Sequence, residues 1–263
     1  IKKGKLNMLQ NKVNFFKKNG YVVVKNLLNK KEIKKIEKTL QRLEVKQKHS
    51  QGLFEPGVKK SLIHSLNSQT DIDFIKQKKE YKELAQKILN SKNVLTWGAK
   101  CNMKKKWHGS CEYYHQDFFY NKKDGFKTGN MITCAIFIDD HSHKNGGLWL
   151  FPKSHKKAYK HDKFLNVNSL QKYLVPTSVL KKLSKANPPI SIKGKRGSCV
   201  FFHCKTVHGS AHNISSLDRK TLIYDICVKD DFEKITKKRA IIEKKDRKDF
   251  EKKELKKRLK NIA

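Results

Sequence analysis

Short runs of β-branched and aromatic residues, separated by turn-forming residues, fill the chain from residue 94 to residue 226 and limit the folds it can adopt. The runs cover residues 94–97, 99–104, 113–120, 131–139, 148–151, 198–202 and 219–226. Glycine-rich turns interrupt them, and Lys144-Asn145-Gly146-Gly147 has the composition of a hairpin turn. Many short strands joined in this way are typical of a β-sandwich or a closed jelly roll. We therefore expect a mainly β fold.

Amphipathic helices are expected on the N-terminal side of this β region. The first covers residues 6–19 and ends at Gly20, and its apolar positions recur at helical spacing: Leu6, Leu9, Val13 and Phe16. A short strand follows at residues 21–24. The second helix begins near Asn29, where Asn29 and Glu32 have the spacing of a capping box, and its apolar face consists of Ile33, Ile36, Leu40 and Leu43. A third helix is expected over residues 81–89.

The predicted strand at residues 113–120 contains His115-Gln116-Asp117. On a strand, residues two positions apart point to the same face, so the imidazole and the carboxylate are expected side by side. They would supply two of the three protein ligands of a 2-His-1-carboxylate site, which leaves half of the coordination sphere of Fe(II) open. In a chain with 11 histidines such a pair also occurs as two polar groups on a half-exposed strand. A second histidine is needed to distinguish a metal site from two polar groups on a half-exposed strand.

His208 is the candidate for that second histidine. It lies about ninety residues after Asp117, begins the sequence His208-Gly209-Ser210, and is followed eleven residues later by Arg219, at the start of the last predicted strand. A guanidinium group matches the geometry of a carboxylate. His141, His143, His203 and His212 are alternative ligands.

Three separate blocks resemble the phytanoyl-CoA dioxygenase family of Fe(II)/2-oxoglutarate oxygenases. Residues 114–117, Tyr-His-Gln-Asp, match the family's W/Y-H-Q-D block, and residues 145–156 resemble its N-G-x-L-x-x-x-P-G-S-H-K block, with Lys153 in place of the glycine. The third block is His208-Gly209-Ser210 with Arg219 at the family spacing. The resemblance implies a double-stranded β-helix (a jelly roll, cupin-like) with flanking N-terminal helices, over residues 1–228.

The resemblance also implies the roles of individual residues. His115, Asp117 and His208 are expected to bind Fe(II), and only His208 among the histidines has the Gly-Ser and Arg pattern behind it. Arg219 is expected to hold the distal carboxylate of 2-oxoglutarate. The hydroxyl groups of Ser210 and Thr133 are expected to bind this cosubstrate, although both also fit ordinary strand positions. Related halogenases have a small residue where this chain has Asp117, so the family pattern favours hydroxylation, with O2 as the second cosubstrate and succinate and CO2 as co-products.

The substrate is expected to be a small organic molecule, with an anionic one favoured by the abundant lysine. The candidate substrate-binding residues are Lys104, Tyr113, Phe119 and Tyr120, and each fits surface charge or barrel packing equally well. Two other functions remain open. One is a non-catalytic, cupin-like metal-binding protein. The other is a basic oxygenase that binds or demethylates nucleic acid.

The formal charge of +37 and the pI of about 10.0 are typical of proteins that bind nucleic acid or anionic membrane surfaces. However, only six of the 61 basic residues are arginine, the side chain best suited to bases and phosphates. The charge is also spread over the chain, since residues 229–263 carry a net charge of only +7. Nucleic acid is therefore not the expected partner.

The remaining features bear on location and on peripheral segments. The six cysteines form no C-x-x-C motif, so we expect reduced thiols in the cytoplasm. No apolar run reaches the length of a membrane span, and the basic N-terminus lacks the apolar segment of a signal peptide. Residues 45–75 are expected to form loops that border the active site, residues 156–189 a partly helical polar insertion, and residues 229–263 a charged helix or tail.

Overall fold

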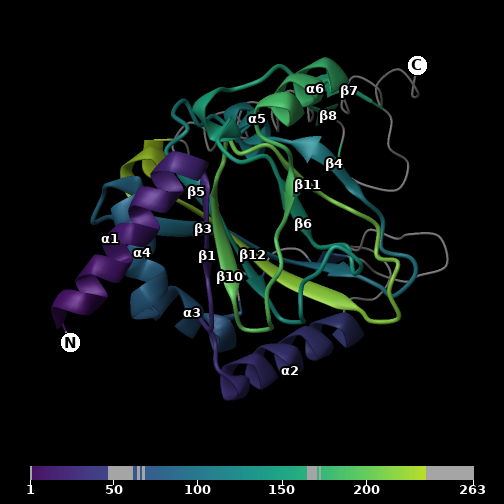
Figure 1. Ribbon diagram of the computed structural model, residues 1–263. Coiled ribbons are helices and arrows are strands. Elements are labelled where there is room, and N and C mark those ends of the chain that lie inside the picture. Colours follow the sequence, from purple (N-terminus) through teal and green to yellow (C-terminus); the bar gives the residue numbers. More distant parts are fainter. Residues whose placement is uncertain are drawn as a thin grey trace, which may run out of the picture.

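Two antiparallel β-sheets face each other in the computed structural model, which describes residues 2–46, 62–63, 66, 69–164, 171 and 173–234 (Figure 1). The larger sheet has six strands in the order β1 (Tyr21–Val24), β10 (Cys199–His203), β5 (Met131–Phe137), β12 (Arg219–Val228), β3 (Val94–Lys104) and β2 (Leu62–Ile63). The smaller has four, in the order β4 (Glu112–His115), β11 (His208–Ser210), β6 (Leu148–Leu150) and β9 (Ile190–Ser191). Neighbouring strands are mostly distant in sequence, as in a jelly roll, so the expected fold class is confirmed.

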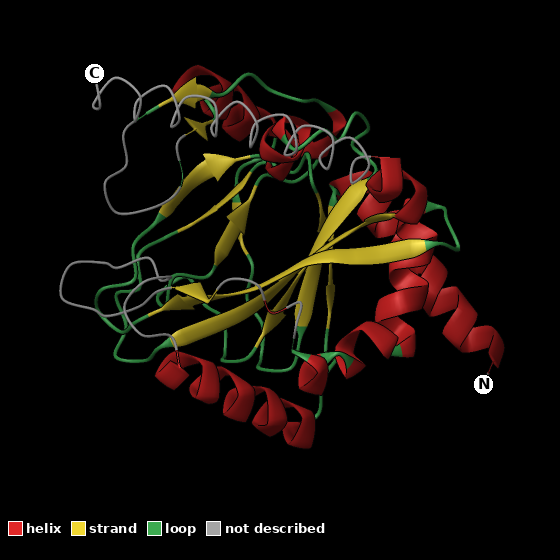
Figure 2. Cartoon of the chain, turned by 180° about the vertical axis from the view of Figure 1, so that it is seen from behind, coloured by secondary structure: helices red, strands yellow, loops and turns green. Residues whose placement is uncertain are grey.

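Helices α1 (Lys2–Asn19), α2 (Lys30–Lys46) and α4 (Lys79–Leu89) pack on the outer side of the larger sheet (Figure 2). Helix α1 ends as expected at Gly20, which has φ +81° and whose N–H donates to the Phe16 carbonyl. The predicted capping box is confirmed at the start of α2. The Asn29 N–H donates to Glu32 Oε2 over 2.8 Å, and the Glu32 N–H donates to Asn29 Oδ1 over 3.0 Å.

The alternation of side chains along β12 explains where the core and the cavity lie. Leu222, Tyr224 and Ile226 are buried against the helices, whereas Arg219, Thr221, Ile223 and Asp225 line a cavity between the sheets. Burying a large apolar side chain contributes about 1.5–3 kcal/mol, so the helix-facing side stabilises the fold. The cavity-facing side is left free for polar groups.

Shorter elements complete the described chain: η2 (Thr70–Ile72), α3 (Phe74–Gln77), α5 (Asp117–Lys123), η3 (Ser154–Lys156), β7 (Asp162–Lys163), β8 (Tyr173–Leu174) and α6 (Thr177–Ala186). Helix α6 makes the insertion partly helical, as expected. Residues 229–234 are helical, and the rest of the predicted C-terminal segment lies outside the described residues. So does most of the predicted loop region at residues 45–75. No helix in the described ranges is both long and apolar enough to cross a bilayer.

The prediction of one strand over residues 113–120 is wrong. Strand β4 ends at His115, and α5 begins at Asp117. Gln116 redirects the chain, because its N–H donates to His161 Nε2 over 3.0 Å and its side-chain amide donates to the carbonyls of Lys157 and Lys205. These long-range contacts override the strand preference of the aromatic residues that follow.

Two further predictions need correction. Residues 94–104 form one strand, β3, with an irregularity opposite Asp225 and Ile226, rather than two strands. Residues 144–147 do not form a hairpin turn, because β5 lies in the larger sheet and β6 in the smaller one. The connection crosses between the sheets and is fixed by Asn145, whose Oδ1 accepts the Ser142 N–H over 2.9 Å.

Candidate metal centre and cosubstrate pocket

His115, Asp117 and His208 come together at one edge of the smaller sheet. His115 at the end of β4 lies opposite His208 at the start of β11, and Asp117 is the first residue of α5. The Nε2 atoms of both histidines are 3.6 Å from Asp117 Oδ1. The three potential ligand atoms lie within 4.8 Å of one another, and the described residues contain no second group of this kind. The predicted triad is therefore assembled by two strands and a helix, and His115 and Asp117 do not share one strand as expected.

Backbone carbonyl groups fix the tautomers of both histidines. His115 Nδ1 donates to the Tyr113 carbonyl over 2.8 Å, and His208 Nδ1 donates to the Thr206 carbonyl over 2.9 Å. Gln171 Nε2 also lies 3.2 Å from His115 Nδ1, but its two hydrogens are taken by the carbonyls of Tyr113 and Tyr173. Each ring therefore presents the lone pair of Nε2 toward Asp117, as a metal-binding histidine does.

The electrostatics of the triad favour a bound cation. Burial opposes ionisation of Asp117, but its interactions with the imidazole groups of His208 and His115 outweigh burial and hold the pKa of this carboxyl well below its usual range. Burial lowers the pKa of His208, which keeps its imidazole neutral. Burial acts on His115 in the same way, but Asp117 prevails and raises the pKa of His115. Binding a metal there would displace a proton.

The donor set fits Fe(II). Two neutral imidazoles and one carboxylate on one side of a cavity are the ligands of the facial triad of non-haem iron oxygenases. The Nε2 lone pairs of His115 and His208 both point toward Asp117. Among the described residues, the carboxylate of Asp117 is the polar group that each Nε2 atom contacts. Three protein ligands leave positions open for reactants.

The Thr133 hydroxyl connects Asp117 to a second carboxylate. Thr133 Oγ1 lies 3.0 Å from Asp117 Oδ2 and 3.1 Å from Asp225 Oδ1. A hydroxyl group has one proton, so it can donate to only one of the two carboxylates at a time. Thr133 lines the cavity, but its contacts orient a metal ligand; its predicted contact with the cosubstrate stays a prediction.

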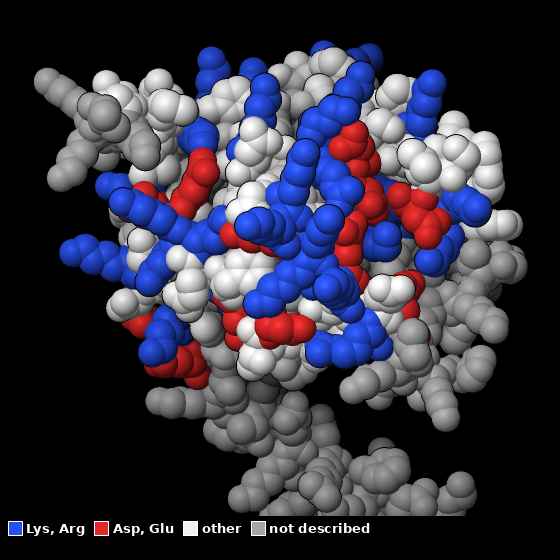
Figure 3. Space-filling view, turned by 90° about the horizontal axis from the view of Figure 1, so that it is seen from below, with Lys and Arg blue, Asp and Glu red and all other residues white. Residues whose placement is uncertain are grey.

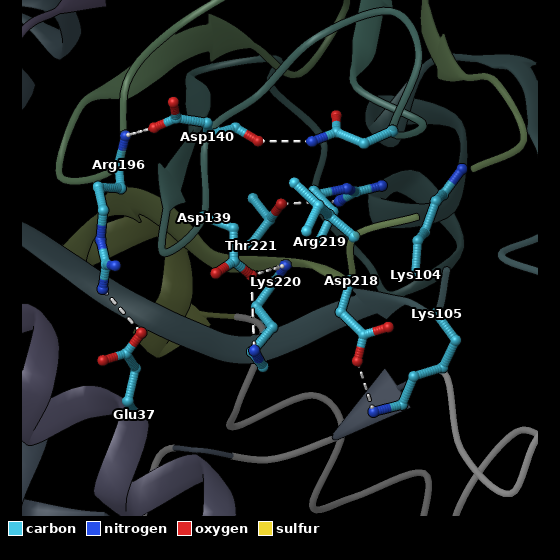
Figure 4. Close-up of polar contacts among 12 residues, drawn as sticks. Glu37, Lys104, Lys105, Asp139, Asp140, Arg196, Asp218, Arg219, Lys220 and Thr221 are labelled. Atoms are coloured by element: carbon cyan, nitrogen blue, oxygen red, sulfur yellow. Dashed lines mark hydrogen bonds and ion pairs between the residues drawn. The ribbon is translucent and has the colours of Figure 1, made fainter. Parts of the chain in front are cut away.

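A cavity of about 230 Å³ extends from the triad between the sheets. Arg219 lies at the end remote from the triad, is only 4% exposed, and donates to Thr221 Oγ1 and to the Gly146 carbonyl, both over 2.7 Å (Figure 4). Its buried Nε has no hydrogen-bond partner. Burial lowers the pKa of Arg219 to about 10, so the guanidinium remains charged at neutral pH. A buried cation with an unused N–H fits an anionic ligand in the cavity.

Ser210 also lines the cavity, whereas Lys104 supports it from behind. Lys104 Nζ donates to Ser210 Oγ over 2.8 Å and to the Ala211 carbonyl. Lys104 is only 2% exposed and is absent from the residues that line the cavity. Direct contact of Lys104 with a substrate therefore stays a prediction.

The three aromatic residues predicted to bind substrate do not line the cavity. Tyr113 is 47% exposed, Phe119 stacks on His161, and Tyr120 lies edge-on to the His115 ring. Phe119 and Asp117 both belong to α5, where residues two apart do not share a face as they would on the expected strand.

The alternative histidines do not join the triad. His203 Nδ1 accepts the Lys205 N–H over 3.0 Å, and His143 and His212 are exposed. His141 lines the cavity near Arg219, where its Nε2 lies 2.8 Å from Thr221 Oγ1. Burial lowers the pKa of His141 well below its usual value, so it is a neutral group at the Arg219 end of the cavity.

Several charged and polar residues in the cavity were not predicted from the sequence: Lys100, Asn102, Glu112, Gln171, Thr221 and Asp225. The period-2 alternation of strands could have identified most of them. If Arg219 faces the cavity, then Thr221 and Asp225 on the same strand must also face it. On β3, Lys100 and Asn102 alternate with the core residues Ala99, Cys101 and Met103, so they face the opposite side.

A family model described as phytanoyl-CoA dioxygenase (PhyH) matches residues 16–221, which is most of the chain. The chain belongs to the phytanoyl-CoA dioxygenase family. The matched range includes His115, Asp117, His208 and Arg219. The resemblance noted in the sequence is therefore confirmed at the level of the family.

Curated relatives include small-molecule hydroxylases. The chain is 34% identical over 143 residues to an ectoine dioxygenase of Bordetella bronchiseptica, covering 51% of this chain and 46% of that protein. It is 29% identical over 152 residues to an L-proline trans-4-hydroxylase of Streptomyces griseoviridis, covering 53% and 56%. The chain thus spans about half the length of the curated relatives it matches.

Similar solved structures include that of EctD from S. alaskensis with 2-oxoglutarate and 5-hydroxyectoine. It superposes with a TM-score of 0.70 at 18% identity and covers 83% of this chain and 75% of that one. At this identity the similarity establishes the fold alone.

Proposed function

We propose that this chain is an Fe(II)- and 2-oxoglutarate-dependent dioxygenase that hydroxylates a small organic molecule and releases succinate and CO2. One observation carries the proposal. The His115, Asp117 and His208 donor atoms share one cavity with the buried, incompletely bonded guanidinium of Arg219. A metal-binding protein without turnover requires the three donor atoms but not the guanidinium of Arg219.

The protein residues would act mainly by holding and orienting reactants. His115, Asp117 and His208 would bind Fe(II), and Arg219 would pair with the distal carboxylate of 2-oxoglutarate, with the Ser210 hydroxyl beside it. When bound, the iron would supply O2 activation, in which one oxygen atom enters the substrate and the other enters succinate as the keto acid loses CO2. The neutral His141 and Thr221 would complete the polar wall at the Arg219 end.

The size of the cavity supports a small substrate. Its volume of about 230 Å³ is below the range of roughly 300–1,000 Å³ that is typical of sites for drug-sized ligands. Ectoine and proline, which the names of the two relatives give as substrates, are small molecules of this kind.

The decisive assay measures succinate released from 2-oxoglutarate with Fe(II), O2 and a panel of small metabolites. We expect at least one metabolite to stimulate release in the wild type, and His115→Ala and Arg219→Ala to reduce the release to background. The exposed residues His143 and Arg42 provide matched controls, and His143→Ala and Arg42→Ala should leave the release unchanged. Equal release by His115→Ala and the wild type would contradict the proposal. Metal binding without any turnover would favour the non-catalytic alternative.

The distribution of surface charge does not favour nucleic acid as a substrate. Figure 3 shows lysine and arginine side chains gathered on one face, with acidic side chains among them. Ion pairs neutralise part of this charge, such as Arg196 with Glu37 at 2.7 Å and Lys105 with Asp218 at 3.0 Å (Figure 4). Binding of DNA or RNA that weakens steeply with added salt would revive that alternative.

We also infer a reducing location such as the cytoplasm. Its support is that all six cysteines are free thiols and that five of them are buried.

A further inference from the structure

Two oppositely charged side chains line the cavity beside the candidate metal centre. Lys100 lies on β3 and Asp225 on β12. Lys100 is opposite Ile223, and Asp225 is opposite Gly98, so the two charged residues are diagonal neighbours on the cavity-facing side of the larger sheet. The function proposed above uses neither of them.

The described residues compensate the two charged groups only in part. Burial lowers the pKa of Lys100, but the nearby carboxylates of Asp225, Asp117 and Glu112 outweigh burial and raise it. No described residue accepts a hydrogen bond from Lys100 Nζ, and the Lys100–Asp225 pair is not among the ion pairs within 4.0 Å. Asp225 Oδ1 contacts the Thr133 hydroxyl, but Oδ2 has no partner. Both side chains are half-buried, and polar groups in a cavity whose hydrogen bonds are incomplete are usually completed by water or by a ligand.

Gly98 leaves space for the Asp225 carboxylate. A Cβ atom at residue 98 would lie 3.0 Å from Asp225 Oδ2 and 3.4 Å from Asp225 Cβ. Any other residue would therefore press against this carboxylate. The absence of a side chain keeps Oδ2 accessible from the cavity.

The pair lies at the opposite end of the cavity from Arg219. Six residues of strand separate Arg219 from Asp225, which corresponds to roughly 20 Å along β12. Asp225 is joined to the metal ligand Asp117 through Thr133. Arg219 and Asp225 thus lie at different ends of the cavity, with Asp225 on the side of Asp117, and the pair is left available to a second molecule.

We propose that Lys100 and Asp225 bind the substrate, and that the substrate is a small zwitterion of the amino-acid type, with its carboxylate at Lys100 and its cationic nitrogen at Asp225. This inference rests on the proposed function and specifies its substrate class. A singly charged substrate would leave one of the two half-buried charges without a counter-charge, and a neutral substrate would leave both. Such a mismatch is a strong basis for discrimination in a small site.

The test measures ligand binding to the Fe(II)- and 2-oxoglutarate-loaded protein without O2, from the shift in the unfolding midpoint over a ligand titration. The probes are ectoine and the neutral α-amino acids, including L-proline. Each amino acid is paired with its carboxamide, which lacks the negative charge, and with its N-acetyl form, which lacks the positive charge. We expect at least one zwitterion to bind and both of its singly charged counterparts to bind at least about tenfold more weakly.

Variants assign the two charges to residues. Lys100→Met should weaken binding of the zwitterion at least about tenfold and remove the preference over the carboxamide. Asp225→Asn should weaken it similarly and remove the preference over the N-acetyl form. The same substitutions at exposed positions, Lys181→Met and Asp230→Asn, are the controls and should leave binding unchanged. Succinate release stimulated by the same compounds provides a second readout.

Each outcome decides a separate question. If no zwitterion binds, if a singly charged counterpart binds equally well, or if the Lys100 and Asp225 variants lower only the unfolding midpoint, the pair is structural and the inference is wrong. Uptake of Fe(II) and 2-oxoglutarate is measured first on the same wild-type protein. Failure of that uptake would overturn the proposed function itself, whereas intact uptake with no preference for zwitterions would overturn only the substrate class.

Discussion

At the scale of single residues, the metal centre depends on groups that touch the ligands rather than on the ligands alone. The carbonyls of Tyr113 and Thr206 set the tautomers of His115 and His208. The Thr133 hydroxyl donates to Asp117 Oδ2 and so orients this carboxylate. Removing a group that orients a metal ligand in this way typically lowers the metal affinity by about 10–100-fold.

Replacement of Thr133 by valine tests this supporting role. Valine keeps the shape of the side chain but cannot donate to Asp117, so we expect the affinity for Fe(II) to fall about 10–100-fold while the fold is retained. Anaerobic Fe(II) titration measures the effect. Thr128→Val is a matched control, because Thr128 also bonds an aspartate, Asp231, but at an exposed site. Unchanged affinity in Thr133→Val would mean that the hydroxyl has no part in holding Asp117.

Arg219 is the residue on which cosubstrate binding is expected to depend. Arg219→Lys keeps the positive charge but loses the planar fork, so the Kd for 2-oxoglutarate should rise at least about tenfold, while Fe(II) uptake remains normal. Equilibrium titration with 2-oxoglutarate provides the measurement. If the lysine variant binds the keto acid as tightly as the wild type, the guanidinium is not its anchor.

At the scale of elements, the strand-to-helix change at Gln116 is the feature that the sequence predicted least well. The aromatic residues at positions 118–120 favour a strand locally, but the bonds from Gln116 to His161, Lys157 and Lys205 come from parts of the chain that are distant in sequence. Such contacts cannot be deduced from local pattern. The family motif nevertheless named three residues that the fold brings together, since it specifies residues and not the element that carries them.

Lys153 is a second case in which a family motif was informative. It replaces the glycine of the family block, and it adopts a left-handed conformation with φ +64°. A non-glycine residue in this region is strained by roughly 1–2 kcal/mol, part of which glycine would recover after its own entropy cost. Lys153→Gly should therefore raise the free energy of unfolding by about 0.5–1 kcal/mol in urea denaturation. Lys153→Ala, which keeps the strain, should change it little, and a destabilised glycine variant would contradict this explanation.

At the scale of the whole molecule, the fold class and the helices were predictable because they follow from periodicity. The residues that orient the candidate metal ligands and the Lys100–Asp225 end of the cavity were not predictable, because their positions depend on strand register. Lys100 comes near Asp225 only because β3 pairs with β12, and no local pattern specifies that pairing. Once one inward-facing residue on each strand is known, the others follow from alternation.

A metal centre that joins β4, α5 and β11 should stabilise the whole domain. Fe(II) binds the assembled site and not the unfolded chain, so a hundredfold excess over Kd should add about 2.7 kcal/mol to the free energy of unfolding. Anaerobic urea denaturation with and without Fe(II) measures this difference. The same addition should have no effect on Asp117→Ala, and equal stabilisation of that variant would indicate binding elsewhere.

The most direct test of the account is the stoichiometry of Fe(II) bound anaerobically to the purified chain and to its single variants. We expect one Fe(II) per chain in the wild type and in His212→Ala, whose histidine is exposed and outside the triad. We expect stoichiometric binding to be lost in His115→Ala, Asp117→Ala and His208→Ala. Retention of one tightly bound Fe(II) in any of these three variants, or its absence from the wild type, would contradict the assignment of the metal centre.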